Sequence, residues 1–212
     1  MEKLGEDICT TLVNALITRF SPLKGPKITT FAAKKFIPTG PVQQWGKLQI
    51  TEGGDRMACR AMIKPGSLGR DCTYIRVGPL SPAAFLLIFN NVFYSKYEAT
   101  VDRNARFKNK QPEMALETFF GELQRIVKIN VPASPSLRLD VPQTLFYAIV
   151  RQCNARKSRE GFWEYTLLGG LEAVDIGLIQ CVVGRIFDRG KWAIIDRSGT
   201  RAHVDIEAGE IQ

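Results

Sequence analysis

The sequence predicts a mainly β domain (α+β class), a small, partly open antiparallel barrel of the SH3-like or BAH-like kind, preceded by an N-terminal amphipathic helix. Between residues 119 and 131 apolar and polar side chains largely alternate, as in a strand with one dry face, and Arg125 and Ile126 break the pattern. Residues 145–150 are apolar on both faces, which is typical of an interior strand. Prolines in the intervening segment 132–143 exclude a helical crossover, so we expect two neighbouring antiparallel strands.

Composition and charge describe a folded, basic protein. Its 212 residues suffice to bury a substantial core, and 45% hydrophobic with 24% charged residues are ordinary values for a globular protein. The formal net charge of +8 indicates an acidic partner, with nucleic acid first and an anionic membrane surface second. A basic protein that binds no polyanion is the alternative.

Cysteine usage favours a reducing compartment. The five cysteines are widely spaced and form no CxxC pair. The first residues, MEKLGEDICTTL, are charged and lack the apolar core of a secretory signal. We therefore expect an intracellular protein with free thiols, and a disulfide framework is the alternative.

The first 44 residues predict a helix and a linker. Apolar residues at spacings of three, four and one predict an amphipathic helix over 7–20, with Asp7 as its N-cap, that ends at Ser21-Pro22. Prolines and lysines recur through 21–44, which predicts an extended basic linker rather than a packed element. The expected division is a helix in 1–20, a linker in 21–44, a β-rich domain in 45–204 and an acidic tail in 205–212.

The remaining short strands are predicted from alternation and turn residues. WGKLQI (45–50) and RMACRAMI (56–63) form a hairpin, whose turn uses the positive φ available to Gly53-Gly54. FWEYTLL (162–168) alternates, and the next two glycines then turn the chain. The last hairpin joins LIQCVVGRIF (178–187) to KWAIID (191–196).

The segment 77–96 differs in composition from its charged and polar neighbours. It is strongly apolar from Ala83 to Tyr94 yet shorter than a membrane span, and without it Arg76 would join Tyr97 in a continuous strand. It opens with Val, whose codons begin with GT, and closes with Lys, one of whose codons ends in AG. Those are the boundary dinucleotides of a spliceosomal intron, so we hypothesise a retained intron. A buried helix or strand pair is the alternative, and sequencing the mature transcript distinguishes the two.

Two basic loops are the candidate binding sites. DRNARFKNK (102–110) places cations around one aromatic side chain, which suits a phosphate backbone with a base stacked nearby, although a solvated loop is the alternative. NARKSREG (154–161) follows the central strand, and loops at strand ends are where β-barrel modules hold ligands. The candidate nucleic-acid-binding residues are Arg103, Arg106, Phe107, Lys108, Lys110, Arg156, Lys157 and Arg159.

No catalytic or metal-binding signature accompanies these loops. The single histidine, His203, belongs to no Cys/His cluster, and no GxSxG elbow supports a catalytic triad, so we assign no catalytic residue, metal ligand or cofactor. Scattered carboxylates such as Asp55 and Asp71 leave a Mg²⁺-dependent nuclease open, because the ligands of such a site are usually distant along the chain.

Five stretches of the sequence carry a resemblance as a set. They are WGKLQI…GGD (45–55), RDCTYIR (70–76) with YEATVDRNAR (97–106), TFFGELQRI (118–126), LFYAIVRQCN (145–154) and KWAIIDRSG (191–199). Together they resemble a group of uncharacterised fungal proteins associated with transposons, as accessory or C-terminal portions of transposon-encoded proteins. In that pattern the RDxxYIR strand runs directly into YE, which favours the intron hypothesis. The resemblance implies a nuclear protein that acts on or near DNA or chromatin.

We therefore expect a non-enzymatic nucleic-acid or chromatin-binding module rather than a membrane protein. Its basic loops would contact phosphates, so binding would tolerate sequence changes and weaken with salt. Two alternatives stay open: a remnant of a metal-dependent nuclease, and a protein–protein interaction module without affinity for polyanions.

Overall fold

The computed structural model describes residues 2–22, 26–50, 54–64, 71–78, 100–102, 114–116 and 118–196. Several predicted features lie outside these ranges: Gly53 of the first predicted turn, the segment 77–96 apart from Val77 and Gly78, the first basic loop apart from Asp102, His203, and the acidic tail. The described residues are mainly β, with an N-terminal helix, as the sequence predicts.

The helical segments of the described residues are two α-helices and three single 3₁₀ turns. They are α1 (Glu6–Phe20), α2 (Thr30–Lys34) and single 3₁₀ turns at Arg60–Met62, Pro135–Leu137 and Ile176–Leu178. The strands up to β8 are β1 (Glu2–Lys3), β2 (Pro41–Val42), β3 (Gln44–Trp45), β4 (Lys47–Gln49), β5 (Arg56–Ala58), β6 (Tyr74–Val77), β7 (Thr100–Asp102) and β8 (Met114–Leu116). The strands from β9 on are β9 (Phe119–Val131), β10 (Gln143–Cys153), β11 (Arg156–Lys157), β12 (Trp163–Tyr165), β13 (Leu168–Asp175), β14 (Ile179–Val182), β15 (Gly184–Asp188) and β16 (Lys191–Ile195).

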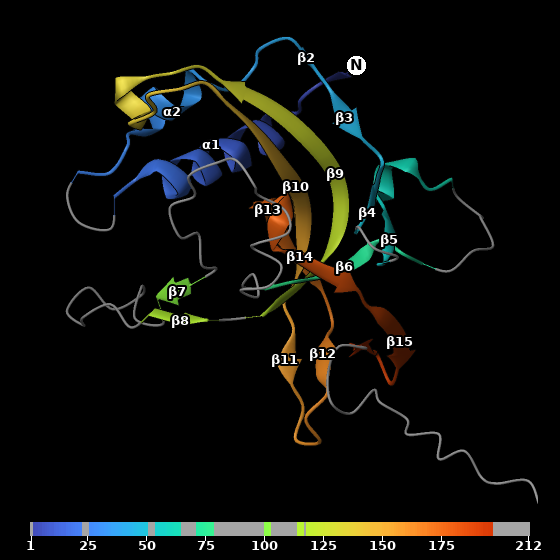
Figure 1. The fold of residues 1–212 in the computed structure, drawn as a ribbon. Helices are drawn as coiled ribbons and strands as arrows, with labels where there is room; N and C mark the ends of the chain where they lie inside the picture. The colour runs from blue at the N-terminus through green and yellow to red at the C-terminus, as the bar shows by residue number, and fades with distance from the viewer. Residues whose placement is uncertain are drawn as a thin grey trace, which may run out of the picture.

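A six-stranded antiparallel sheet forms the main layer of the described residues. Its strands run in the order β13-β10-β9-β6-β14, and β3 also pairs with β9. β9 and β10 are antiparallel neighbours that curve together (Figure 1), which confirms the prediction made from the alternating and apolar runs. The path does not close on itself, so these residues form an open sheet and no closed barrel.

A β-bulge at Gln124 explains why the alternation in β9 is imperfect. Along β10, successive residues pair with Arg125 and then with Leu123, which leaves Gln124 as the extra residue. Immediately beyond the bulge, both faces of β9 are buried. Val127 lies in the core cluster beneath α1, whereas Ile126 lies in a second cluster on the opposite face. Ile126 is therefore buried, and the face of β9 that the sequence pattern predicted to be exposed to solvent is covered at this position.

A four-stranded sheet, in the order β11-β12-β16-β15, forms the second layer. The predicted strand over 178–187 is divided between the two sheets, because the chain leaves the first sheet at Val183 and enters the second at Gly184. The predicted hairpin between β15 and β16 is confirmed. Its turn places both Arg189 and Gly190 at positive φ, 46° and 80°, as a tight two-residue hairpin turn requires.

α1 packs against β13 and contributes Leu12 and Leu16, both fully buried, to the core. It ends at Phe20 as predicted, because a proline at position 22 disfavours helical backbone at the residue before it. The predicted N-cap is wrong: Gly5 occupies that position, and the Asp7 carboxylate lies in the first turn and accepts the Ile8 N–H. Among the described residues, neither helix is long and apolar enough to cross a membrane.

Residues 21–44 differ from the predicted extended linker. Thr29 caps α2 by accepting a backbone hydrogen bond, and β2 pairs with β1. Ala33, Ile37 and Val42 are buried in the cluster that α1 shares with β9 and β10. Lys27, Lys34 and Lys35 are exposed, so the basic composition of the segment conceals three widely spaced core positions.

The two glycines expected to turn the chain instead lie within β13, and the bend falls at residues 166–167. At Gly169 a Cβ would come within 2.7 Å of the Asn154 Oδ1 atom. The position therefore uses the small size of glycine for a close approach and not its conformational freedom.

Candidate nucleic-acid interface

The second predicted basic loop forms a hairpin at the exposed end of the four-stranded sheet. β10 ends at Cys153, and β11 then pairs with β12. The loop between them is held by two hydrogen bonds, from the Ser158 N–H to the Phe162 carbonyl at 2.7 Å and from the Phe162 N–H to the Ser158 hydroxyl at 3.1 Å. Arg156, Lys157 and Arg159 are all exposed on this hairpin.

The β15–β16 hairpin carries two more cations on the same sheet. β16 pairs with β12, so the hairpin that carries Arg189 and Lys191 belongs to the same sheet as the β11–β12 hairpin. Tyr165 pairs with Trp192, so the β15–β16 turn lies at the end of β12 opposite to the β11–β12 loop. Both of these side chains are exposed. We call the five cations of the two hairpins the basic tip: Arg156, Lys157, Arg159, Arg189 and Lys191.

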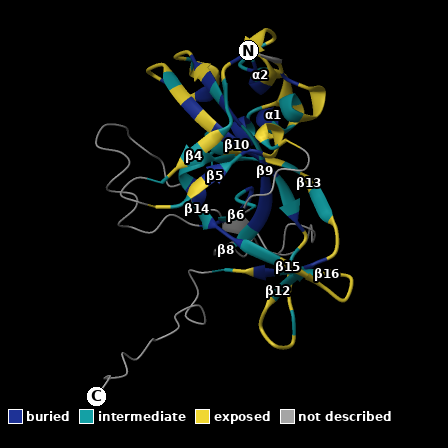
Figure 2. Ribbon diagram, turned by 90° about the vertical axis from the view of Figure 1, so that its right-hand side faces the viewer, coloured by how far each residue is buried: buried dark blue, intermediate teal, exposed yellow. Residues whose placement is uncertain are grey.

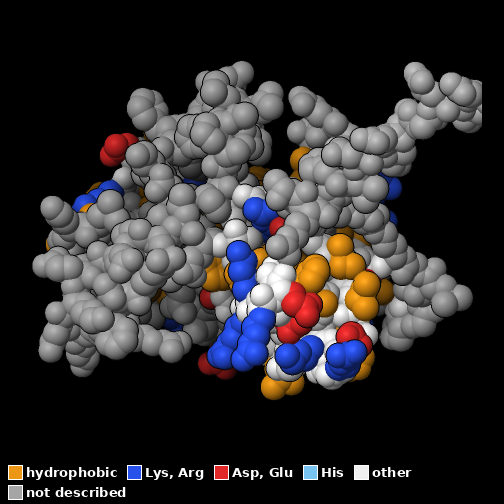
Figure 3. All heavy atoms as spheres, turned by 90° about the horizontal axis from the view of Figure 1, so that it is seen from below, with side chains coloured by type: hydrophobic (Ala, Val, Ile, Leu, Met, Phe, Trp, Pro, Cys, Tyr) orange, Lys and Arg blue, Asp and Glu red, His pale blue; other side chains and the backbone are white. Residues whose placement is uncertain are grey.

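The charges of the basic tip are only partly neutralised. Lys191 Nζ lies 3.2 Å from a Glu164 carboxylate oxygen, and Arg189 Nε lies 3.9 Å from an Asp188 oxygen. Arg156, Lys157 and Arg159 form no ion pair with another described residue. Figure 2 shows exposed loops at this end of the molecule. Seen from below, Lys and Arg side chains gather there beside acidic and hydrophobic ones (Figure 3).

Exposed apolar side chains accompany these cations. Phe162 and Phe187 are 50% and 58% exposed, and Ile186 on the same sheet is 55% exposed. Phe187 stacks on Trp192 with ring centroids 5.0 Å apart, while the Lys157 ammonium lies 5.4 Å from the Trp163 ring centroid. Ile186 and Phe187 follow one another in β15, so their side chains expose apolar surface on opposite faces of the sheet.

The structure tests part of the predicted site. It brings Arg156, Lys157 and Arg159 together, whereas Arg103, Arg106, Phe107, Lys108 and Lys110 lie outside the described residues. Sequence reasoning missed Arg189, Lys191 and Phe162 as members of the same surface. The pairing of β12 with β16 brings Arg189 and Lys191 onto this sheet, and no local motif in the sequence indicates that pairing.

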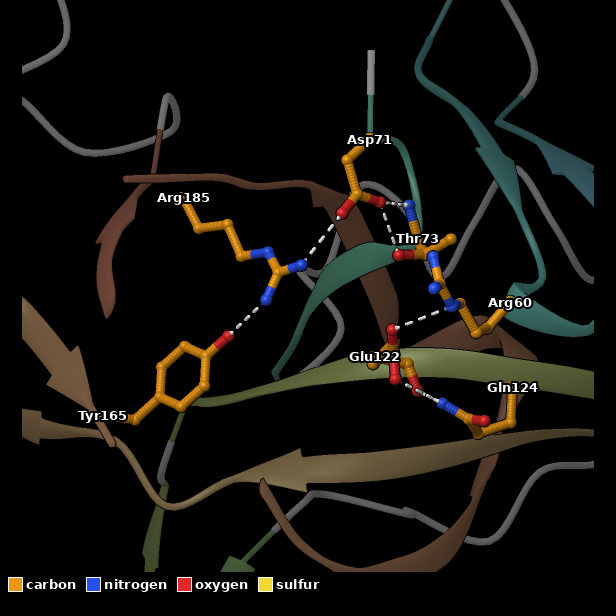
Figure 4. A network of polar contacts seen from close by, with 7 residues as sticks. All are labelled: Arg60, Asp71, Thr73, Glu122, Gln124, Tyr165 and Arg185. Atoms are coloured by element: carbon orange, nitrogen blue, oxygen red, sulfur yellow. Dashed lines mark hydrogen bonds and ion pairs between the residues drawn. The ribbon is translucent and has the colours of Figure 1, made fainter. Parts of the chain in front are cut away.

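Arg185 fastens the four-stranded sheet to the six-stranded one. Its guanidinium carbon lies 3.8 Å from the Tyr74 ring centroid and 4.0 Å from the Trp192 ring centroid. Its Nη1 donates to the Tyr165 hydroxyl at 3.1 Å and its Nη2 to the Asp71 carboxylate at 3.2 Å (Figure 4). Because its partners come from both sheets, Arg185 holds the base of the hairpins that carry the basic tip.

Burial and the Arg185 charge shift the pKa values of the neighbouring titratable groups. Burial raises the pKa of the Cys153 thiol to about 12, so it is not the thiolate nucleophile at neutral pH. Burial also raises the pKa of both Tyr74 and Tyr165. Burial acts to raise the pKa of Asp71, but hydrogen bonds from Thr73 and the charge of Arg185 outweigh it, so that pKa lies below its usual value.

The carboxylates considered for a nuclease have structural partners. Asp55 accepts the Val182 N–H at 2.8 Å, and Asp71 is held by Thr73 and Arg185. Within the part of the chain that the structure describes, no group of three or more His, Cys, Asp or Glu side chains is placed to hold a metal ion.

A scan of protein-family models and searches of curated proteins and of solved structures find no match to this chain. Its function is therefore inferred from the charge, exposure and geometry of the residues themselves.

Proposed function

We propose that this protein is a non-enzymatic nucleic-acid or chromatin-binding module that contacts phosphates through the basic tip. The observation that carries the proposal is the exposed hairpin with Arg156, Lys157 and Arg159, which form no ion pair with another described residue. Arg and Lys side chains are the usual partners of nucleic-acid phosphates, and such contacts carry no sequence information. Binding is therefore sequence-tolerant and strongly dependent on salt.

Exposed aromatic side chains support the same ligand. Phe162 follows the loop that carries Arg159, and Phe187 lies on the neighbouring hairpin. Aromatic rings beside cations allow unpaired bases to stack while the phosphates meet the charges, as in proteins that bind single strands.

The wider setting is also part of the proposal. The resemblance of the five stretches to fungal transposon-associated proteins supports a nuclear, mobile-element-associated role. The open antiparallel sheet with its curved β9–β10 pair supports an SH3-like or BAH-like partly open barrel.

A second candidate function is a protein–protein interaction module. Five of the nine exposed large hydrophobic residues among the described positions lie between 162 and 195: Phe162, Leu167, Ile186, Phe187 and Ile195. Such a concentration favours a protein partner that buries them.

Binding of a fluorescently labelled DNA, as duplex and as single strand, separates the two candidates. At about 50 mM salt we expect fluorescence anisotropy to report binding that weakens about tenfold or more at about 200 mM salt, because phosphate contacts release counterions. Binding that is absent, or unchanged by salt, would overturn the nucleic-acid proposal and favour a protein partner.

A further inference from the structure

A cavity of about 280 Å³ lies between the start of α1 and the face of the six-stranded sheet. Its lining includes three cations from three different strands: Lys3 of β1, Arg125 of β9 and Arg151 of β10. None of them belongs to the basic tip. Leu4, Ile149 and other apolar side chains form the rest of its wall, so the cavity joins a cationic region to an apolar one.

Two irregularities in the sheet occur where the cations line this cavity. The bulge at Gln124 places Arg125 on the same face of β9 as Val127, which is the face covered by α1. The pairing of β10 with β13 shifts register immediately after Arg151. Bulges commonly re-aim side chains next to functional sites, and here both irregularities adjoin cavity-lining arginines.

The cavity carries more positive than negative charge. Neither Lys3 nor Arg151 forms an ion pair with a carboxylate in the described ranges. Asp7 also lines the cavity and sets one carboxylate against the three cations. Arg125 Nη1 donates to the Gln44 side chain at 2.8 Å. Like charges around a partly enclosed space repel one another, and a bound anion relieves that repulsion.

We infer that this cavity binds a phosphate-bearing anion, with the cations holding the phosphate and the apolar wall holding a small organic group. Guanidinium groups match phosphate oxygens with two parallel hydrogen bonds, and Lys supplies a compact charge. The volume exceeds what a lone phosphate needs, so a phosphate monoester fits better than inorganic phosphate.

The test is calorimetric titration of the full chain with inorganic phosphate and with ethyl phosphate at matched ionic strength. We expect both to bind, ethyl phosphate the tighter. Arg151→Gln should weaken both about tenfold or more, because a charge-assisted contact is lost. Lys128→Gln is the matched control, since Lys128 lies on β9 but alternates with the cavity-facing residues, and it should leave affinity unchanged.

Lys3→Gln provides a second test in case the Arg151 variant fails to fold. Lys3 is exposed, so its replacement should not disturb the fold. It should also weaken phosphate binding. No binding to the wild-type chain, or equal affinity in the Arg151→Gln, Lys3→Gln and Lys128→Gln variants, would overturn the inference. Tighter binding of inorganic phosphate than of ethyl phosphate would overturn the monoester assignment. Failure of the DNA experiment would leave this cavity's test unaffected, since the two sites share no residue.

Discussion

At the scale of single residues, the Arg185 side chain is enclosed by partners from both sheets. Two aromatic rings sandwich its guanidinium, while a tyrosine hydroxyl and a carboxylate receive its hydrogen bonds. Three of the four partners, at positions 71, 74 and 165, are distant in sequence, and the fourth, Trp192, lies across the β15–β16 hairpin. Sequence reasoning therefore gave Arg185 no role, because a cation in an alternating strand looks the same whether it is solvated or enclosed.

Replacing Arg185 by Met should lower the free energy of unfolding by about 2–3 kcal/mol, because two hydrogen bonds and the cation–π contacts are lost. Urea denaturation measures this change. Arg189→Met removes the same charge from a side chain that is 93% exposed, and should change stability by less than about 0.5 kcal/mol. Equal effects from the two variants would show that Arg185 does not join the sheets.

The Asp71 carboxylate should give the protein part of its resistance to acid. Because its folded pKa lies below the ordinary value of 3.8, the ionised form stabilises the fold above that pH. That contribution is lost as the pH falls through the folded pKa. Asp71→Asn should therefore be less stable than the wild type at pH 7, and the gap should narrow on acidification below about pH 4. Thermal unfolding of both proteins across this range checks the prediction, and a constant gap would contradict it.

At the scale of elements, the strands with a clear period were predictable and those defined by long-range pairing were not. Apolar and polar residues largely alternate in 119–131, and residues 145–150 are all apolar. Both strands could therefore be predicted from their own residues alone. β14 and β15 form one apolar run in sequence, and only their partners, β6 and β16, divide them. α2 was missed because the lysines and prolines around it outweigh its one buried alanine.

The candidate site was predictable to the same extent. The loop after the central strand could be placed at a strand end from its position in sequence, and the structure does expose its cations there. The contribution of the β15–β16 hairpin depends on the pairing of Glu164 with Ala193, between strands far apart in sequence. No spacing rule encodes that register.

The β9–β10 pair depends on Gly121 as a point of close approach. A Cβ there would lie 2.2 Å from Val150 Cγ1 and 2.9 Å from the Arg151 carbonyl oxygen, and neither the β-branched side chain nor the backbone can yield easily. Gly121→Ala should therefore lower the free energy of unfolding by about 1–3 kcal/mol.

Gly170→Ala is the control, because a Cβ at that position meets nothing within 4 Å. It should be neutral or slightly stabilising, since alanine reduces the freedom of the unfolded chain. Chemical denaturation of both variants measures the change in the free energy of unfolding that each substitution causes. A Gly121 variant as stable as the Gly170 variant would show that the two strands separate there without loss.

At the scale of the whole molecule, the described part has a packed end and a charged end. α1 and α2 lie at the top of Figure 1, where they share a core with β9 and β10. The hairpins β11–β12 and β15–β16 project at the bottom. The rigid sheets therefore support the basic tip, and loops held on such a scaffold are where binding residues commonly lie.

The most direct test of phosphate binding by the basic tip is the salt dependence of DNA affinity in two charge-matched triple variants. Arg156→Gln, Lys157→Gln and Arg159→Gln together remove three cations from the tip. Lys27→Gln, Lys34→Gln and Lys35→Gln remove three exposed cations from the neighbourhood of α2. The slope of log affinity against log salt should become shallower by about 2–3 in the tip variant, since each lost phosphate contact reduces it by about 0.9 on duplex DNA, and should not change in the α2 variant. The same slope in the tip variant as in the wild type would contradict a role for these side chains in binding phosphate.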